Sequence, residues 1–271
     1  MKRFNILLVM SVLIGSFTSC SQDTENEFVP SAQVVNFDVN ISKTRTVTEG
    51  KVTSFIEDDQ IGVFGMKRGT TEILNPNVKY AYTDNGKWLA DKSITYPLDN
   101  SPINFYAYYP YGDYQTTHFD FVISSDQSKD NGYERSDLLL AKNEEALPGD
   151  GAVSLQFKHL MAMIEVKPVL PNGVTLTAVT LLHAATTSSV DLINQTVITK
   201  SDASAPLSSI TLMKVGDVYR GVLPEQTLTG RIFEFIGVNE AGQKVMFDYT
   251  LENSVTLTIN KITPFEIILQ Y

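Results

Sequence analysis

The residue types that do chemistry are few in this chain. Among 271 residues there is one cysteine, Cys20, and there are three histidines, His118, His159 and His183. The sequence has no Gly-rich phosphate loop, no nucleophile elbow and no His-Glu-x-x-His motif. A single cysteine excludes internal disulfides, and the scattered histidines have no metal-ligand spacing. We therefore expect no enzyme activity, no metal and no cofactor.

Two acidic stretches offer oxygen ligands, Glu57-Asp58-Asp59 and Asp130-Asn131. Neither has the spacing of a calcium loop, which needs a Gly and a distal Glu, so both are predicted to be solvated turns. Glycoside hydrolysis needs only two carboxyl groups brought together in space. A β-sandwich glycosidase is therefore kept as the weakest functional alternative.

Composition limits the class of protein. The chain has 21 basic and 31 acidic residues, a net charge of -10, and no cluster of Lys and Arg, which excludes nucleic acid as a partner. Hydrophobic residues make up 43% of the sequence and can form a buried core. At a typical ~150 residues per domain, the length predicts two domains.

The N-terminal segment has the composition of an export signal. Lys2 and Arg3 precede an apolar run from Phe4 to Phe17, which is shorter than the ~20 residues of a membrane-spanning helix. Cys20 follows this run directly, after Thr18 and Ser19, and the segment resembles the lipobox of bacterial lipoproteins. Lipidation of Cys20 is the expectation, and an ordinary secretory signal is the alternative.

The residues after Cys20 are polar and acidic, which predicts a disordered tether over 20–31 behind a signal peptide over 1–19. This tether resembles the acidic tag that sends some Gram-negative lipoproteins to the outer face of the outer membrane. We therefore expect a lipid-anchored protein at the cell surface.

Apolar residues alternate most regularly in the segment that follows, at Val35, Phe37, Val39 and Ile41, which predicts a strand with one buried face. Short apolar runs between turn signals predict further strands at 60–65, 78–83, 94–96, 103–109, 119–124, 153–159, 174–182, 190–193, 197–199, 210–213, 219–223, 232–238, 245–251, 255–259 and 265–271. A stretch rich in charge, Pro and Gly at 142–151 predicts a linker. The pattern favours an all-β fold with two tandem Greek-key β-sandwiches, over 32–147 and 148–271.

Several stretches resemble the fimbrillin family, the type V pilin subunits of Gram-negative bacteria. They occur in the family's order at residues 55–65, 86–88, 103–110, 137–141, 153–160 and 221–226. One departure is Asp58, where the family usually has Gly. The resemblance implies tandem transthyretin-like β-sandwiches, export as a lipoprotein, and a structural or adhesive role in surface fibres with other pilus subunits as partners.

The resemblance also implies a mechanism of assembly. Family pilins polymerise after an arginine-specific protease cuts behind the first strand, which leaves a groove that a strand of the next subunit fills. Arg45 and Thr46 occupy that position here, directly behind the exchangeable strand of Val35, Phe37, Val39 and Ile41. The alternative is that Arg45 is an ordinary exposed residue.

The C-terminal segment is the candidate donor strand. Its apolar residues alternate to the end of the chain, and Pro264 is predicted to lie at the start of this strand; the alternating residues are Phe265, Ile267, Leu269 and Tyr271. The alternative is that the segment forms the last strand of the second sandwich.

Tyrosines between residues 105 and 114 suggest a second function. Strand alternation places Tyr106 and Tyr108 on one face and Tyr109 on the other, so some of these rings are expected to be partly exposed. Exposed tyrosines could stack on sugar rings, which would make the protein a lipid-anchored glycan-binding protein of the outer membrane. Packing within the core and the sheet is the favoured interpretation.

Overall fold

The computed structural model describes residues 32–42 and 54–271, and these residues form an all-β structure, which confirms the predicted fold class. Within them the helical structure is one 3-10 turn, η1 (Glu134–Ser136). No helix in this part of the chain is long and apolar enough to cross a bilayer. The predictions on Cys20, Arg45, Thr46 and the tether fall outside the described ranges.

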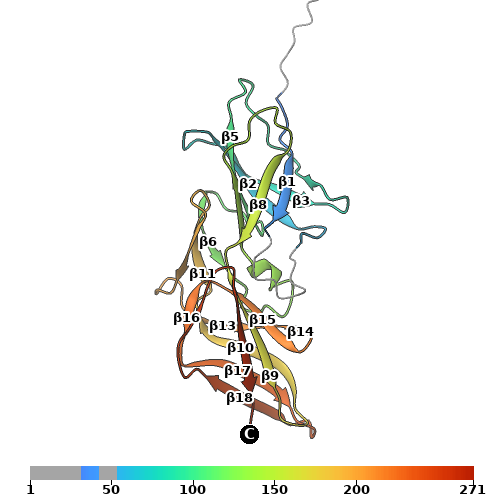
Figure 1. Ribbon diagram of the computed structural model, residues 1–271, viewed down its shortest axis with the longest axis vertical. Coiled ribbons are helices and arrows are strands. Elements are labelled where there is room, and N and C mark those ends of the chain that lie inside the picture. Colours follow the sequence, from blue (N-terminus) through green and yellow to red (C-terminus); the bar gives the residue numbers. More distant parts are fainter. Residues whose placement is uncertain (1–31, 43–53) are drawn as a thin grey trace, which may run out of the picture. The chain divides into compact units, whose positions relative to one another are not determined.

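A seven-stranded sheet forms the first part of the structure (Figure 1). Its order is β1 (Phe37–Ile41), β8 (Val153–His159), β7 (Leu139–Asn143), β5 (Ile103–Tyr109), β2 (Gln60–Lys67), β3 (Ile73–Tyr82) and β4 (Trp88–Leu89).

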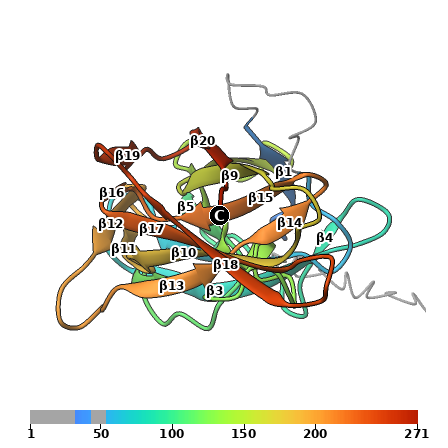
Figure 2. The same ribbon diagram turned by 90° about the horizontal axis from the view of Figure 1, so that it is seen from below.

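The remaining strands form four smaller sheets. Figure 2 shows the first two of these sheets as separate layers. One has the strand order β13 (Ser208–Thr211), β10 (Thr175–Ala184), β17 (Arg231–Val238) and β18 (Lys244–Thr250). The other has the strand order β14 (Met213–Val215), β15 (Val218–Leu223), β9 (Ala162–Val169) and β20 (Ile262–Ile268). The others are β12 (Thr196–Lys200), β11 (Thr187–Asp191), β6 (His118–Val122), and the pair β16 (Gln226–Leu228) and β19 (Val255–Leu257).

Strand pairing crosses the predicted domain boundary at 147/148 in both directions. β8 follows the boundary in sequence, yet it pairs with β1 and β7 of the seven-stranded sheet. β6 precedes the boundary, yet it pairs with β11. Residues 32–271 also cluster as one compact unit. The boundary itself stays a prediction, and each sheet is described here by the strands that it contains.

Both faces of the seven-stranded sheet are buried. Along β5, Phe105 and Ala107 belong to one hydrophobic cluster, which we call the front core, whereas Tyr106 and Tyr108 belong to a second, the rear core. Successive side chains of a strand point to opposite faces, so the two cores lie on opposite sides of the sheet. The rear core also contains residues of β9, β10, β15, β17 and β20.

Burial on both faces explains why β7 carries an apolar run instead of an alternating pattern. Leu138 and Leu140 point into the rear core, and Leu139 and Ala141 point into the front core. A strand covered on both sides reads as continuously hydrophobic, so period two did not predict it.

Gly62 of β2 is required by close packing across the sheet. It lies opposite Tyr108 in the register of β2 and β5. A Cβ atom at Gly62 would overlap the Tyr108 ring and the Asn77 side chain. Only glycine therefore lets the fully buried Tyr108 side chain cross over β2.

The turn before β2 contains a residue in the left-handed region. Asp58 has φ of 71°, a conformation that glycine adopts without steric cost and that other L-residues adopt at a cost. The backbone N–H of Asp58 donates to the Tyr82 carbonyl over 3.1 Å, which fixes the turn against the end of β3. The chain thus has an aspartate in a conformation that suits glycine.

We predict that Asp58→Gly increases the free energy of unfolding by about 0.5–1 kcal/mol, because relief of the left-handed strain exceeds the added entropy of the unfolded chain. Urea unfolding of the two proteins measures this difference. Asp84→Gly is the matched control, since Asp84 lies in an exposed turn without a positive φ. A less stable Asp58→Gly protein would contradict the strain argument.

Candidate assembly site

The predicted exchangeable strand lies at the edge of the seven-stranded sheet. β1 pairs in parallel with β8, with Phe37 opposite Val153 and Ile41 opposite Phe157 (Figure 1). The ladder is closed at its ends by hydrogen bonds from Val153 N to the Asn36 carbonyl (2.8 Å) and from Ser42 N to the Phe157 carbonyl (2.7 Å). The strand is therefore neither free on the surface nor enclosed within a sheet.

The other side of this segment is paired only before β1 begins. Val35 N donates to the Ile94 carbonyl over 2.8 Å, and Tyr96 N donates to the Gln33 carbonyl over 2.9 Å. An isolated antiparallel bridge joins Val34 to Thr95. Among the described residues, β1 itself pairs with β8 alone, so residues 37–41 have one hydrogen-bonded side.

The alternating side chains of this segment complete the front core. Val35 is 2% exposed, and Phe37, Val39 and Ile41 pack against the same cluster while Asp38 and Asn40 are exposed. The Phe37 ring makes edge-to-face contacts with Tyr80 and Phe105, at centroid distances of 5.1 and 5.4 Å. The slot between these rings thus fixes the register of the strand.

The burial of these four side chains is large on the scale of domain stability. Full burial of an aliphatic or aromatic side chain contributes ~1.5–3 kcal/mol. Because three of the four are only partly buried, roughly 4–8 kcal/mol is a reasonable upper value for the set. A domain is stable by ~5–15 kcal/mol in total, so loss of the strand would leave the front core marginal.

Sequence reasoning missed Phe55, which lies just after the undescribed residues 43–53. Its ring contacts Trp88, Tyr109 and Phe157 edge to face, at 4.9, 5.5 and 5.7 Å. Ser42, just before the gap, donates to the carbonyl of the same Phe157. Ser42 and Phe55, which lie in the described ranges on either side of the gap, therefore both contact Phe157 at the end of β8.

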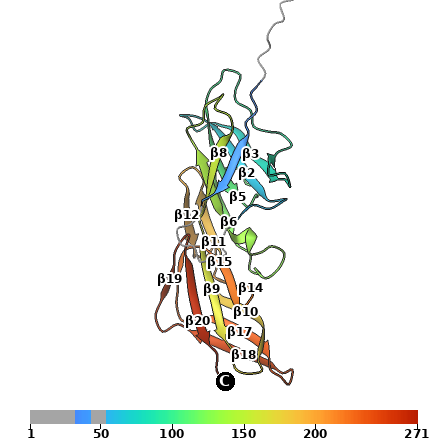
Figure 3. The ribbon, with the colours of Figure 1, turned by 45° about the vertical axis from the view of Figure 1, so that its right-hand side comes forward.

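The candidate donor strand, β20, is also an edge strand in parallel pairing. It lies beside β9 with Phe265 opposite Val166 and Ile267 opposite Pro168 (Figure 3). Phe265, Ile267 and Leu269 are at most 8% exposed, and Phe265 packs edge to face on Phe233 at 5.2 Å. Within this structure the segment is the last strand of its own sheet, which is the arrangement that the alternative predicted.

Two details at the C-terminus differ from the predicted strand. Pro264 lies inside β20, opposite Glu165, and not at its start. An edge strand tolerates the missing N–H because its outer side has no partner. Tyr271 lies beyond the end of β20 and is 81% exposed, with its ring 5.6 Å from that of Phe247.

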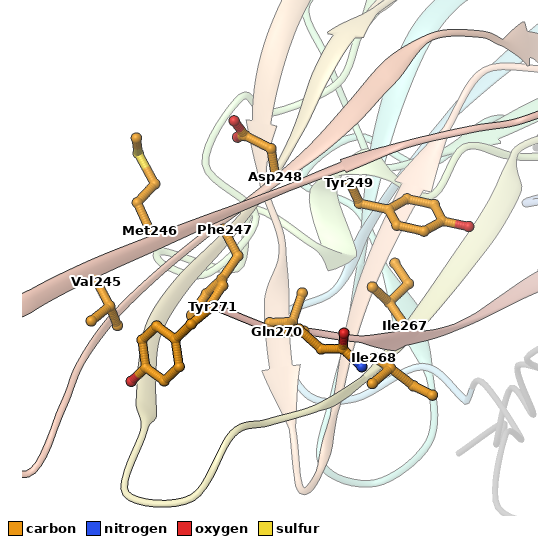
Figure 4. A pocket seen from close by; sticks show the side chains of 10 residues that line it. Val245, Met246, Phe247, Asp248, Tyr249, Ile267, Ile268, Gln270 and Tyr271 are labelled. Carbon is orange, nitrogen blue, oxygen red and sulfur yellow. The ribbon is translucent and has the colours of Figure 1, made fainter.

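A hollow of about 590 Å³ lies between the outer sides of β18 and β20. Met246, Phe247, Ile268 and Tyr271 are among the residues that line it (Figure 4). β18 and β20 are both edge strands of their sheets. The C-terminal end of β20 therefore borders the hollow, and in the described structure β20 pairs with β9 alone.

The tyrosine run is mostly buried. Tyr106 and Tyr108 are at most 3% exposed, which agrees with the favoured interpretation of core packing, and the partial exposure expected of some ring is found at Tyr109. The rear core covers the face of β5 that carries Tyr106 and Tyr108. Burial, together with a 2.6 Å hydrogen bond from its hydroxyl to Glu144, raises the pKa of Tyr106 to about 12. Tyr109 is only half-buried.

The three histidines are placed separately. His118 lies 3.0 Å from Asp191 on an exposed face, and His183 is exposed. His159 belongs to β8, and its Nδ1 lies 2.8 Å from Oδ2 of Asp137, with each side chain 15% exposed. In the described ranges no group of three or more His, Cys, Asp and Glu side chains could hold a metal ion.

The His159–Asp137 pair makes the stability of the folded protein depend on pH, through an interaction at the C-terminal end of β8. Burial acts to lower the pKa of His159, but the hydrogen bond and the charge of Asp137 raise it, and the net pKa is raised. A raised folded-state pKa gives stability that is fully present below the unfolded pKa of ~6.5. This stability is lost as pH rises through the folded-state pKa.

We predict that Asp137→Asn lowers the pKa of His159 to below ~6.5, because the asparagine removes the charge while the burial remains. NMR titration of the imidazole signals measures this pKa. Asp191→Asn, beside the exposed His118, is the control and should leave the His159 signal unchanged. A pKa of His159 that stays raised in Asp137→Asn would contradict the pairing.

The chain resembles known proteins in sequence and in structure. A protein of Bacteroides uniformis, named provisionally as fimbrium subunit Fim1C, is 29% identical over 269 residues, covering 89% of this chain and 86% of that protein. A Bacteroides ovatus protein, named provisionally as fimbrium tip subunit Fim1C, is 30% identical over 192 residues. That alignment covers 62% of this chain and 35% of the relative, so the chain matches about a third of that protein's length.

Solved structures share the fold. The crystal structure of a protein from Bacteroides ovatus, assigned provisionally to cell adhesion, has a TM-score of 0.64 at 18% identity, covering 88% of this chain and 92% of that one. One from Bacteroides uniformis has a TM-score of 0.61 at 19% identity, covering 79% and 88%. The sequence profile described as fimbrillin-like matches residues 44–271. The chain belongs to the fimbrillin-like family.

Proposed function

We propose that this chain is a subunit of a bacterial surface fimbrium, which is exported as a lipoprotein and assembles by strand exchange at the position of β1. Family membership and the names of the two Fim1C relatives support a fimbrial role. The observation that carries the proposal is that β1 packs the apolar side chains of Phe37, Val39 and Ile41 against the front core while pairing with a single strand.

An edge strand of this kind can be replaced without rebuilding the sheet. Removing β1 exposes the free edge of β8 and the apolar walls of the slot, among them Tyr80 and Phe105. An incoming strand would restore the ladder hydrogen bonds and refill the side-chain pockets, which is recognition by strand addition. A subunit that has lost β1 is thus less stable alone than with a neighbour's strand bound in its place.

Proteolysis behind Arg45 supplies a way to open the slot. Arg45 follows β1 and precedes Phe55 in the sequence, so a cut there would separate β1 from the rest of the sheet. The new chain would begin at Thr46, and the contacts of Phe55 with Trp88, Tyr109 and Phe157 would keep its start attached. β1 would then be held only by non-covalent contacts and could be displaced.

The C-terminal strand of a second copy fits the vacated position in sequence. β1 reads Phe-Asp-Val-Asn-Ile from Phe37, and the C-terminal segment reads Phe-Glu-Ile-Ile-Leu from Phe265, the last of these residues, Leu269, lying just beyond β20. Both are edge strands in parallel pairing, and in both the Phe ring packs edge to face on other aromatic rings. In the proposed exchange, Phe265 enters the Phe37 slot and the strand keeps the polarity of β1.

The exchange replaces one parallel edge pairing with another. β20 would leave β9, losing the contact of Phe265 with Phe233, and would gain the corresponding contacts in the neighbour's front core. Because gains and losses are of the same kind, they nearly cancel.

The lipid anchor is the other part of the proposal. Lipidation of Cys20 would attach the protein to the outer membrane, since two or more acyl chains give stable anchoring. Its partners would be other pilus subunits through strand addition, together with ligands on host or bacterial surfaces. The acidic residues 20–31 would act as the tether between the membrane and the first strand.

We predict that an arginine-specific protease cuts the folded chain behind Arg45 and that the cut protein forms a ladder of oligomers. N-terminal sequencing should give a start at Thr46, and native electrophoresis should show the ladder. Arg45→Gln should block both results, whereas Arg135→Gln, at an exposed arginine, should block neither. Cut protein that stays monomeric would contradict exchange at β1.

We also predict the register of the exchanged strand. In the present structure Asp38 lies opposite Ser154, and both are exposed, so Glu266 of the donor should take the place of Asp38. A Ser154→Cys acceptor, cut behind Arg45, should form a disulfide with a Glu266→Cys donor, both in a Cys20→Ser background. Ile268→Cys, two residues along the donor, is the off-register control.

Non-reducing electrophoresis followed by mass spectrometry of the linked peptides measures the yield. Linkage should be at least tenfold greater for Glu266→Cys than for Ile268→Cys. Equal linkage for the two donors would disprove this register, and failure of both while the ladder still forms would mean that another segment is the donor.

A further inference from the structure

A second hollow, of about 460 Å³, has no residue of β1 among those that line it. Three segments that are distant in sequence form its walls: the turn before β2 with Asp58 and Gln60, the end of β5 with Tyr109 and Tyr111, and the residues around η1 with Glu134 and Arg135. No single motif spans these segments, so the sequence analysis treated the tyrosines and the acidic turn separately.

The walls of this hollow are fixed by hydrogen bonds. Tyr111 N donates to the Gln60 carbonyl over 2.9 Å, which ties the second wall to the first. The hydroxyl of Tyr109 donates to Oδ1 of Asp59 over 2.9 Å, and its ring packs edge to face on Phe55 at 5.5 Å. Arg135 N donates to the Asn131 carbonyl over 2.9 Å. The site is therefore largely formed before any ligand arrives, as is usual for small-molecule sites.

The polar side chains of the hollow are available to a ligand. In the described structure, Asp58, Gln60, Asn131, Glu134 and Arg135 line the hollow and make no side-chain hydrogen bond or ion pair with the protein. Carboxylates accept hydrogen bonds, the guanidinium donates them, and the amides do both. The lining thus presents donors and acceptors together, which matches a ligand that carries hydroxyl groups.

Aromatic rings and net charge narrow the ligand class. Tyr109 and Tyr111 are half-buried, and the ammonium of Lys79 lies 5.8 Å from the centre of the Tyr111 ring. Rings of this kind offer an apolar face beside polar groups. Among the lining residues, the three carboxylates of Asp58, Asp59 and Glu134 outnumber the one cation, Arg135, and they still outnumber the cations when Lys79 beside Tyr111 is included, which disfavours anionic ligands.

We propose that this hollow is a binding site for a neutral saccharide, with the sugar ring against Tyr111 and its hydroxyl groups bonded to Asp58, Glu134 and Arg135. The proposal does not rest on strand exchange, because none of these residues belongs to β1, β8 or β20. It narrows the glycan-binding alternative of the sequence to the rings of Tyr109 and Tyr111, since Tyr106 and Tyr108 are buried in the rear core.

The test is calorimetric and NMR titration of the full mature chain, carrying Cys20→Ser to prevent lipidation. The probes are mannotriose, N,N′-diacetylchitobiose and lactose, with 3′-sialyllactose as the anionic counterpart of lactose. At least one neutral probe should bind with a millimolar or lower Kd, and 3′-sialyllactose should bind several-fold more weakly than lactose wherever lactose binds.

Matched variants locate the site. Tyr111→Ala should weaken binding at least tenfold, Tyr111→Phe should retain it, and Tyr271→Ala, at an exposed tyrosine elsewhere, should leave it unchanged. If Tyr111→Ala fails to fold, the exposed pair Glu134→Gln and Arg135→Gln provides the same test and should also weaken binding at least tenfold. The proposal is overturned if no neutral probe binds, or if binding survives these substitutions.

Discussion

The front core depends on one strand that is held from one side. Phe37, Val39 and Ile41 of β1 pack their apolar side chains against this core, yet β1 pairs only with β8. A central strand would be fixed by two ladders and could leave only if the sheet came apart. An edge strand can leave when a single ladder is broken. A similar strand from another chain can then take its place and bury its apolar side chains in the same core.

Coverage of both faces of the seven-stranded sheet determines what its aromatic residues can do. Rings that a one-sided sheet would present to solvent, such as Tyr106 and Tyr108, become core residues whose hydroxyls bond to Glu144 and Asn77. Along β5 itself, a tyrosine reaches the surface only at the end of the strand, at Tyr109. Contact between a ligand and the rings of this strand is thereby confined to the rim of the sheet, where turns add polar side chains to the aromatic rings.

Sequence reasoning succeeded for strands that alternate clearly or form an apolar run between turn signals, such as β1 and β5, and it failed for β7 and β9. The alternation of β1 predicted its position within two residues of its start, whereas the run around Leu139 in β7 has no period. β9 was missed because it contains Pro168. This proline follows the residues of β9 that pair with β15, so its missing N–H removes no bond from that ladder.

For the candidate assembly site too, sequence predicted what depends on local pattern and missed what depends on contacts between distant residues. The local pattern of β1 identified the slot-filling side chains, but the anchoring role of Phe55 depends on Trp88 and Phe157, which are remote in sequence.

The parallel alignment of β1 and β8 also has a mechanical meaning. A strand in this position that is pulled along its own axis loads all of its ladder bonds at once, in shear, and cannot peel away one bond at a time. A fibre joined through such strands would resist tension along the strand direction far better than force applied across it.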